Sequence, residues 1–351
     1  MHLEPRDSVP YWMHVAAPLA AIALTFMLSA GLLIWGDAPV GQAYWELITG
    51  AFGSRLALSE TLLRATPLAL TGLAAAVAFR AKLWNIGGEG QFYMGALAAT
   101  WLGTGIIVLP APLMIPFLFL VGALAGGLLL LLPTLLKVRL NVDEVVTTLL
   151  LNFIVLLLVN YLLFGPLKDP MAMGWPQARP IIDQGVLEVL LPRTRLHWGL
   201  LVTFVVALLT WAFLRFTRWG LEIRAVGHSP EASRFAGVPV NWAVIRTALI
   251  SGGLAGMAGV SELAGTKGYL TMDLSPGFGY TGIAVAMLAG LHPLGCLASA
   301  LFIAAIYNGA DAMSRAVGVS SYIADVMTAV ALLSVMLTVF ATRYRLRLAR
   351  G

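Results

Sequence analysis

Long apolar runs separated by short polar segments dominate this chain. A helix needs roughly 20 apolar residues to cross a bilayer, and the runs that approach this length cover residues 13–35, 61–80, 91–109, 113–136, 144–164, 198–216, 243–264, 276–291, 294–313 and 323–341. Only His292 and Pro293 separate the eighth run from the ninth. The pattern predicts an all-α membrane protein, a polytopic helical bundle of about ten transmembrane helices in a single domain over residues 1–351.

The composition agrees with this class. Apolar residues make up 59% of the chain and charged residues 11%, with a mean hydropathy of +0.87, whereas soluble globular proteins are about a quarter charged. The net charge of +5 comes from basic residues that flank the apolar runs, which is typical of membrane orientation, so nucleic acid is not expected as a partner. The single cysteine, Cys296, excludes a disulfide framework, and no spacing indicates a metal site.

The positions of Lys and Arg predict the orientation. If the N-terminus is cytoplasmic, the two richest basic segments, residues 215–234 and 343–350, both lie on the cytoplasmic side. An odd number of spans would place one of them outside, against the positive-inside rule. We therefore expect a multi-pass membrane protein with both termini cytoplasmic and the long loop 165–197 outside. Segment 36–60, with Tyr44 and Trp45, is expected to form an interfacial helix on the outer side.

Small residues recur every four positions in three of the runs. These are Gly95, Ala99 and Gly103; Gly252 and Gly256; and Gly282, Ala286 and Gly290. Such faces let helix backbones approach closely in a membrane. The glycine-rich segments 87–95 and 252–259 follow the second and seventh runs, and because five spans separate them, a repeat there would be inverted.

Residues Asn85–Gln91 place two amides and a carboxylate around three glycines, between two apolar runs. Uncovered backbone and a bare carboxylate are costly in lipid, so this segment must face protein or a water-filled path. Two interpretations remain open. In one, Asn85, Glu89 and Gln91 line a path for a polar solute. In the other, Glu89 neutralises the start of a helix, where free amides carry partial positive charge, and the two amides satisfy irregular backbone.

The segment 217–242 predicts a short helix in a basic loop. Ser229 suits the N-cap, Pro230 the first helical position, and Gly237 the end. Ala232, Phe235 and Ala236 then share one face, with Glu231 and Arg234 beside it. Two turns of helix are unstable alone in water, so we expect this helix to dock on a protein partner through Glu231, Ala232, Arg234, Phe235 and Gly237. Contact with lipid headgroups is the alternative.

These segments together resemble one group of ABC-importer permeases, which serves ribose and related sugars, branched-chain amino acids and nucleosides. Asn85–Gln91 with the following Ala/Gly-rich run is similar to the hallmark of that group, and residues 226–237 resemble its coupling helix, which sits in a cleft on the ATPase subunit. Residues 141–152 resemble the nucleoside-type branch, which depends on a basic membrane lipoprotein, and residues 278–286 also fit. The resemblance covers residues 60–340. His228 and Gly88 differ from the common family form.

The resemblance implies partners and site residues. It implies a separate ATP-binding subunit, a second permease chain in a homo- or heterodimer, and an extracytoplasmic solute-binding lipoprotein. All of these would assemble at the lipid of a bacterial plasma (inner) membrane. ATP would bind the partner subunit, since this chain has no Gly-x-x-x-x-Gly-Lys-Ser/Thr loop; no cofactor is expected in the chain and no enzymatic activity of its own. Asn152 and Tyr280 lie in the family-like segments and join Asn85, Glu89 and Gln91 as path candidates.

Nucleosides are the expected solute, because few charges lie within the runs, while amides, hydroxyls and an aromatic ring suit a neutral molecule with a sugar and a planar base. Ribose or another simple sugar is the alternative. An ion-coupled secondary transporter, a different class, would need intramembrane carboxylates, for which Glu89 and Asp311 are the candidates. Of the other polar residues, Asn308 is expected to join helices, and Arg246 to extend toward the cytoplasm.

Overall fold

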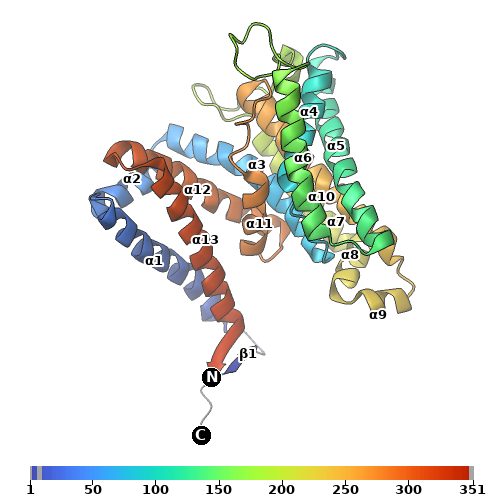
Figure 1. The fold of residues 1–351 in the computed structure, drawn as a ribbon. Helices are drawn as coiled ribbons and strands as arrows, with labels where there is room; N and C mark the ends of the chain where they lie inside the picture. The colour runs from blue at the N-terminus through green and yellow to red at the C-terminus, as the bar shows by residue number, and fades with distance from the viewer. Residues whose placement is uncertain (1, 6–9, 348–351) are drawn as a thin grey trace. The chain divides into compact units, whose positions relative to one another are not determined.

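The computed structural model describes residues 2–5 and 10–347, and this part of the chain is predominantly helical (Figure 1). The helices are α1 (Tyr11–Trp35), α2 (Val40–Phe52), α3 (Arg55–Arg80), α4 (Gly88–Gly103), α5 (Ala111–Leu140), α6 (Glu144–Phe164), α7 (Gly199–Phe216), α8 (Arg218–His228), α9 (Pro230–Phe235), α10 (Val240–Glu262), α11 (Phe278–Leu288), α12 (Pro293–Val317) and α13 (Ser321–Arg343). A 3₁₀ turn, η1 (Asp183–Gly185), and a π-helical segment, η2 (Leu263–Lys267), complete the helical elements, and the two strands are β1 (His2–Pro5) and β2 (Tyr344–Arg347).

Every predicted apolar run coincides with one helix, so the all-α membrane class is confirmed. Among the described residues, six helices are long and apolar enough to cross a membrane by length and composition: α3, α5, α6, α7, α12, and α10 with its π-helical extension. Shorter apolar stretches cover residues 19–35, 278–288 and 329–342. The total of about ten spans and the inverted repeat stay predictions.

The chain forms two compact units. The central unit comprises residues 62–301, and the terminal unit comprises residues 1–61 and 302–351. The single permease domain that we expect over residues 1–351 is a functional grouping and stays a prediction.

Within the central unit, α10 packs along both α4 and α5 (Figure 1). Glycines permit this approach. A Cβ added to Gly95 of α4 would lie 2.2 Å from the carbonyl oxygen of Gly256 in α10, and one added to Gly252 would lie 2.3 Å from the carbonyl oxygen of Gly126 in α5. No side chain fits at such distances, so the prediction that small residues mediate close helix contacts is confirmed here.

Gly290 departs from the predicted small-residue face. Helix α11 ends at Leu288, and Gly290 lies in the following turn with φ +59° and no atom within 4 Å of an added Cβ. Glycine at this position supplies a left-handed backbone conformation rather than a packing surface. Gly282, two turns earlier, does pack as predicted, because its added Cβ would lie 2.6 Å from Thr71 Oγ1 of α3.

The two ends of the central unit differ in character. At one end, segment 165–197 lies against the C-terminal ends of α4 and α10, where the amide of Ile182 donates to Gly103 and that of Leu187 to Ala264. Helices α8 and α9 lie at the opposite end, beside the N-terminal half of α10 (Figure 1). The long loop and the predicted docking helix therefore lie at opposite ends of the same bundle.

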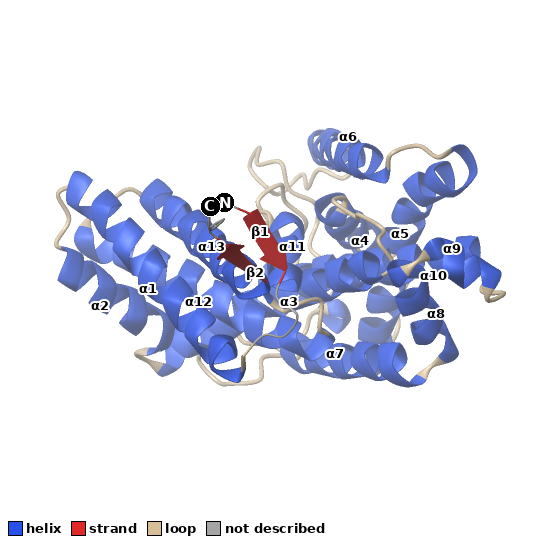
Figure 2. Ribbon diagram, turned by 90° about the horizontal axis from the view of Figure 1, so that it is seen from below, coloured by secondary structure: helices blue, strands red, loops and turns tan. Residues whose placement is uncertain are grey.

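Within the terminal unit, α1 packs along α13, and β1 pairs antiparallel with β2, so that His2 lies opposite Arg347 (Figure 2). Asn308 of α12 donates from Nδ2 to the carbonyl oxygens of Gly50 and Ala57 at 3.0 and 3.1 Å. The prediction that Asn308 joins helices is confirmed. The helix predicted in segment 36–60 is α2, which exposes Trp45.

Candidate functional site

The segment between α3 and α4 is held by its own amides. Asn85 and Gln91 form a reciprocal pair, in which Asn85 Nδ2 donates to Gln91 Oε1 at 2.9 Å and Gln91 Nε2 donates to Asn85 Oδ1 at 2.8 Å. Asn85 also donates to Ser251 Oγ of α10 at 3.1 Å, and that hydroxyl donates to the carbonyl oxygen of Ala74 in α3 at 2.7 Å. The pair thus closes the segment as a loop and joins it to two neighbouring helices.

Asn152 of α6 satisfies the same segment from the other side. Its Oδ1 accepts the amide of Gly90 at 2.8 Å, and its Nδ2 donates to the carbonyl oxygen of Ile86 at 2.9 Å and to Tyr280 Oη at 3.2 Å. Gly90 belongs to the first turn of α4, whose amides have no partner within the helix. The buried Asn152 side chain therefore supplies the hydrogen-bond partners that water would otherwise give to the start of α4 and to the preceding loop.

Glu89 links the starts of two helices. It lies in the first turn of α4, and its Oε2 accepts the amide of Gly279, in the first turn of α11, at 2.7 Å. Gly279 must be glycine for this approach, since an added Cβ would lie 2.1 Å from the Glu89 amide nitrogen. A carboxylate between two helix N-termini is stabilised by both sets of free amides. This geometry favours the structural interpretation of Glu89.

Further anchors, which sequence reasoning missed, hold the N-terminal end of this loop. Glu144, in the first turn of α6, forms an ion pair with Lys137 and accepts the amide of Trp84 at 3.3 Å. One turn later, Thr148 Oγ1 accepts the amide of Ile86 at 3.2 Å. The spacing of Glu144, Thr148 and Asn152 by four residues was the available signal, because it places the three side chains on one helix face.

Burial separates the five path candidates into two groups. Asn85, Glu89, Gln91 and Asn152 are each at most 3% exposed and bond to protein groups, whereas Tyr280 is 38% exposed. In this conformation, Tyr280 is the one candidate whose side chain offers surface to a solute. The structure places all five residues around the same loop, four of them buried and bonded to protein groups and Tyr280 partly exposed. Their role in a solute path stays a prediction.

The predicted docking helix is present as α9. Ser229 caps it, with Oγ accepting the amide of Ala232 at 3.2 Å. At the other end, the amide of Val238 donates to Ser233 and that of Gly237 to Arg234, the pattern of a Schellman motif, and Gly237 has φ +81°. The predicted cap and the left-handed glycine are confirmed.

The outer face of α9 is exposed in the part of the chain that the structure describes. Phe235 is 95% exposed, and Ala232, Ala236, Glu231 and Arg234 are exposed as well. Since a six-residue helix gains little stability from its own backbone, α9 depends on its two caps and on Ser233, which is buried. The face therefore stays available for a partner.

Helix α8, which the sequence analysis did not predict, supports α9. Its N-cap is Thr217, whose Oγ1 accepts the amide of Gly220 at 3.0 Å. Glu222 is buried and accepts hydrogen bonds from Arg218 Nε at 3.1 Å and from Arg246 Nη1 at 3.0 Å. Arg246 pairs with Glu222 and lies 4.8 Å from the centre of the Trp219 ring. Its extension toward the cytoplasm stays a prediction.

His197 is a buried base at the start of α7. Its Nδ1 accepts the amide of Gly199 at 3.1 Å, and within the described residues its Nε2 has no hydrogen-bond partner. Burial lowers the pKa of His197 to about 4, because desolvation penalises the charged form. Gly265 is crowded against the imidazole, since an added Cβ would lie 2.1 Å from Nε2. His197 is therefore neutral and tightly packed at neutral pH.

Lys267 and Asp273 form an ion pair of 2.7 Å near the same end of the unit. The hydrogen bond from Lys267 holds the pKa of the Asp273 carboxyl below its usual value, with a second contribution from Thr271. Asp273 is exposed, so this pair contributes little to stability.

Residues 57–340 match the protein family described as the permease component of the branched-chain amino acid transport system. Similar proteins include a guanosine ABC transporter permease of Bacillus subtilis, 35% identical over 96% of both chains. A glucose ABC transporter permease of Haloferax volcanii is 31% identical over 99% of this chain and 94% of its own length. A nucleoside ABC transporter permease of Lactococcus lactis is 31% identical over 90% of this chain and 88% of its own length. No solved structure matches at a significant level.

Proposed function

This chain belongs to the family of permease components of the branched-chain amino acid transport system, and from that membership we propose that it is the membrane subunit of an ABC importer that translocates nucleosides. Two of the similar permeases are named for guanosine and for nucleosides, and both align along nearly the whole chain. Their names support the substrate predicted from the sequence.

Glucose is the competing solute, because one similar permease is named for it and aligns over 99% of this chain. The higher identity of the guanosine permease, 35% against 31%, favours nucleosides. The ion-coupled carrier has less support, because Glu89 accepts a backbone amide and lies at two helix starts, which leaves that carboxylate committed to protein rather than to an ion.

Tyr280 is the residue that we place on the solute path. Its ring is partly exposed, and Asn152 donates to its hydroxyl, so Asn152 acts as a positioning residue. An aromatic ring fixed in this way offers a stacking face to a nucleoside base. Asn85, Glu89 and Gln91 then shape the loop from which α4 starts, and their direct contact with solute would require a conformation that opens the loop.

The exposed face of α9 supports docking of a separate ATP-binding subunit. Phe235 and its alanine neighbours form a small apolar surface on a helix that is capped at both ends. Glu231 and Arg234 supply charges of both signs, which suits a protein cleft better than an anionic lipid surface. Movement of α9 would reach α10 through α8, because Glu222 and Arg246 join those two helices.

The remaining partners follow from the importer class. Segment 165–197 lies at the end of the central unit opposite α9, which supports its proposed role as the surface that receives an extracytoplasmic lipoprotein. We also propose a second permease chain, in a bacterial plasma membrane, with both termini cytoplasmic. The pairing of β1 with β2 supports the placement of both termini on one side, which requires an even number of spans. The basic segments predict that this side is cytoplasmic.

Uptake by the complete system in proteoliposomes tests the proposed solute. Labelled guanosine and a labelled pyrimidine nucleoside should accumulate only with ATP, and unlabelled glucose or ribose at the same concentration should not compete. Competition by a sugar, with no uptake of any nucleoside, would replace the proposed substrate. Uptake that follows an ion gradient without ATP would replace the transporter class.

Cysteine labelling tests the orientation. Met171 in segment 165–197 is 85% exposed, and Arg139 at the end of α5 is exposed. In a background without Cys296, an impermeant thiol reagent should label Met171→Cys on intact cells and Arg139→Cys only after the cells are opened. The reverse pattern would overturn the proposed orientation.

A further inference from the structure

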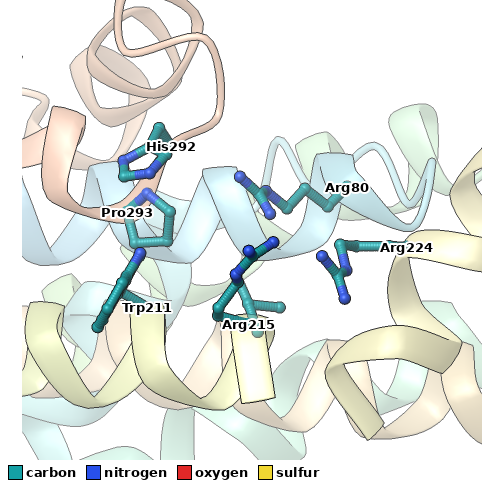
Figure 3. Close-up of a pocket in the computed structure, with 7 residues that line it drawn as sticks. Arg80, Trp211, Arg215, Arg224, His292 and Pro293 are labelled. Carbon is teal, nitrogen blue, oxygen red and sulfur yellow. The ribbon is translucent and has the colours of Figure 1, made fainter. Parts of the chain in front are cut away.

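A cavity of about 270 Å³ lies between α3, α7, α8 and the turn before α12. Its lining includes Arg80, Arg215, Arg224, His292 and Trp211, and the guanidinium groups of the three arginines are directed into the same space (Figure 3). Residues 80 to 293 all belong to the central unit, so these elements form one compact site.

The cavity concentrates positive charge without a counter-charge. Arginine stays protonated in proteins, and no acidic residue lines the cavity. In the part of the chain that the structure describes, no carboxylate pairs with any of the three arginines. Three like charges around one space repel each other, so the arrangement favours an anion between them.

The hydrogen-bond donors left at the cavity suit an oxyanion with several acceptors. Arg80 Nε donates to the carbonyl oxygen of Leu291 at 2.8 Å, so its terminal nitrogens are the ones that face the cavity (Figure 3). His292 Nδ1 accepts the amide of Gly295 at 3.3 Å, which places the ring proton of the neutral form on Nε2. A phosphate accepts bonds from several directions and matches the planar guanidinium fork.

The volume admits more than a small inorganic ion. A water molecule occupies about 30 Å³ in the liquid, so a cavity of about 270 Å³ has room for a phosphate with a substituent. Trp211 lines the cavity, and one turn earlier on α7, Leu208 and Leu209 are exposed. An indole beside an exposed apolar helix surface is typical of the membrane–water interface, where a phospholipid would present its phosphate.

We propose that this cavity is a binding site for a phosphate group, carried by an anionic phospholipid or by a soluble phosphate compound. Basic pockets between helices on the cytoplasmic side suit anionic lipid headgroups. Arg224 lies on α8 and Arg80 ends α3, so a bound phosphate joins α8 to α3. The site is separate from the loop around Asn85 and from the exposed face of α9, and binding to it does not depend on the transported solute.

Binding of defined lipids to the purified chain tests the proposal. Native mass spectrometry would count phosphatidylglycerol and phosphatidylcholine bound at equal concentrations, with Arg215→Gln, Arg224→Gln and the control Arg139→Gln. Arg139 is an exposed arginine on α5 that does not line the cavity. Each cavity arginine should contribute about fivefold to phosphatidylglycerol affinity, and the control variant should bind like the original chain.

Two additional measurements follow. One compares soluble phosphates with lipid to identify the source of the phosphate, and the other uses a conservative variant to detect misfolding. Inorganic phosphate and glycerol 3-phosphate, added to protein in phosphatidylcholine nanodiscs, should raise the thermal midpoint if the source is soluble; a response to phosphatidylglycerol alone assigns the site to lipid. Arg215→Lys keeps the charge and should retain most binding. No preference for phosphatidylglycerol together with no phosphate response, or an equal loss in Arg139→Gln, would overturn the proposal.

Discussion

Arg246 of α10 donates to Glu222 of α8 across 3.0 Å, although 24 positions separate the two residues in the chain. Glu222 is buried and accepts a second bond from Arg218, and Arg246 also lies over the Trp219 ring. This pair fixes α8, and with it α9, to the helix that packs along both α4 and α5. A force applied at α9 therefore has a direct route into the bundle.

We expect Glu222→Gln to weaken this route. The neutral amide cannot balance Arg246, and loss of a charged partner costs about 1–3 kcal/mol. The thermal midpoint should fall, and uptake per ATP hydrolysed should fall further than binding of the ATPase subunit does. Glu188→Gln, at an exposed acid in segment 165–197, is the matched control. If Glu222→Gln and the original chain take up the same amount of solute per ATP hydrolysed, the pair has no mechanical role.

If α9 docks on an ATPase subunit as proposed, Phe235→Asp should disrupt that contact. Phe235 is 95% exposed, so the substitution leaves the folded chain intact but places a charge in an apolar contact, where its desolvation is costly. Copurification of the ATPase subunit and uptake should both fall at least tenfold, an effect of about 1.4 kcal/mol or more, while the thermal midpoint of the isolated chain is unchanged.

Further substitutions at Phe235 and Gly237 serve as controls for this test. Phe235→Leu keeps an apolar side chain and should retain most docking. Gly237→Val should reduce docking through the helix end, because φ +81° is strained for a β-branched residue, and Gly237→Asn should be milder. Normal uptake by Phe235→Asp would exclude this face as the docking surface.

Asn152→Leu and Tyr280→Leu should separate structural support from solute contact. Asn152 bonds to Gly90, Ile86 and Tyr280 in the buried network, so its loss leaves an amide and a carbonyl unpaired, each at about 1–3 kcal/mol. The thermal midpoint and uptake should therefore fall together. Tyr280→Leu should lower uptake with little change in the thermal midpoint. If Asn152→Leu is as stable as the original chain, the Asn152 amide does not support the loop, and its role is contact with the solute.

The sequence predicted those features that depend on local chemistry. The apolar runs indicated the helices, Ser229 and Gly237 marked the ends of α9, and small residues marked the contact of α4 with α10. Each of these depends on residues a few positions apart in the chain, or on composition within one helix.

Features that depend on distant partners were not accessible in this way. The path interpretation of Asn85 and Gln91 did not foresee that the two amides bond to each other and to Ser251. The helix-start interpretation of Glu89 concerned its own helix alone, and it did not foresee the bond from the amide of Gly279, 190 positions away. Packing decides such partners, because a buried polar group takes whichever donor or acceptor the fold brings near.

Acidification should destabilise the chain through His197. The pKa of His197 is about 4 in the folded chain because the imidazole is buried, against 6.5 when it is exposed. Between these values the unfolded chain binds a proton that the folded chain does not, so this contribution to stability is complete above pH 6.5 and is lost as the pH falls toward 4. At pH 5 the loss is about 2 kcal/mol. Protonation of Nδ1 would also break its bond from the Gly199 amide.

Thermal unfolding at pH 7.5 and pH 5 measures this contribution, since other groups titrate in all variants alike. His197→Asn keeps an acceptor near the Gly199 amide and cannot be protonated, so its midpoint should fall less on acidification than that of the original chain. His228→Asn replaces an exposed histidine and should keep the original pH dependence. If His197→Asn and the original chain lose the same stability between pH 7.5 and pH 5, His197 already binds a proton in the folded chain, and its imidazole is reached by water.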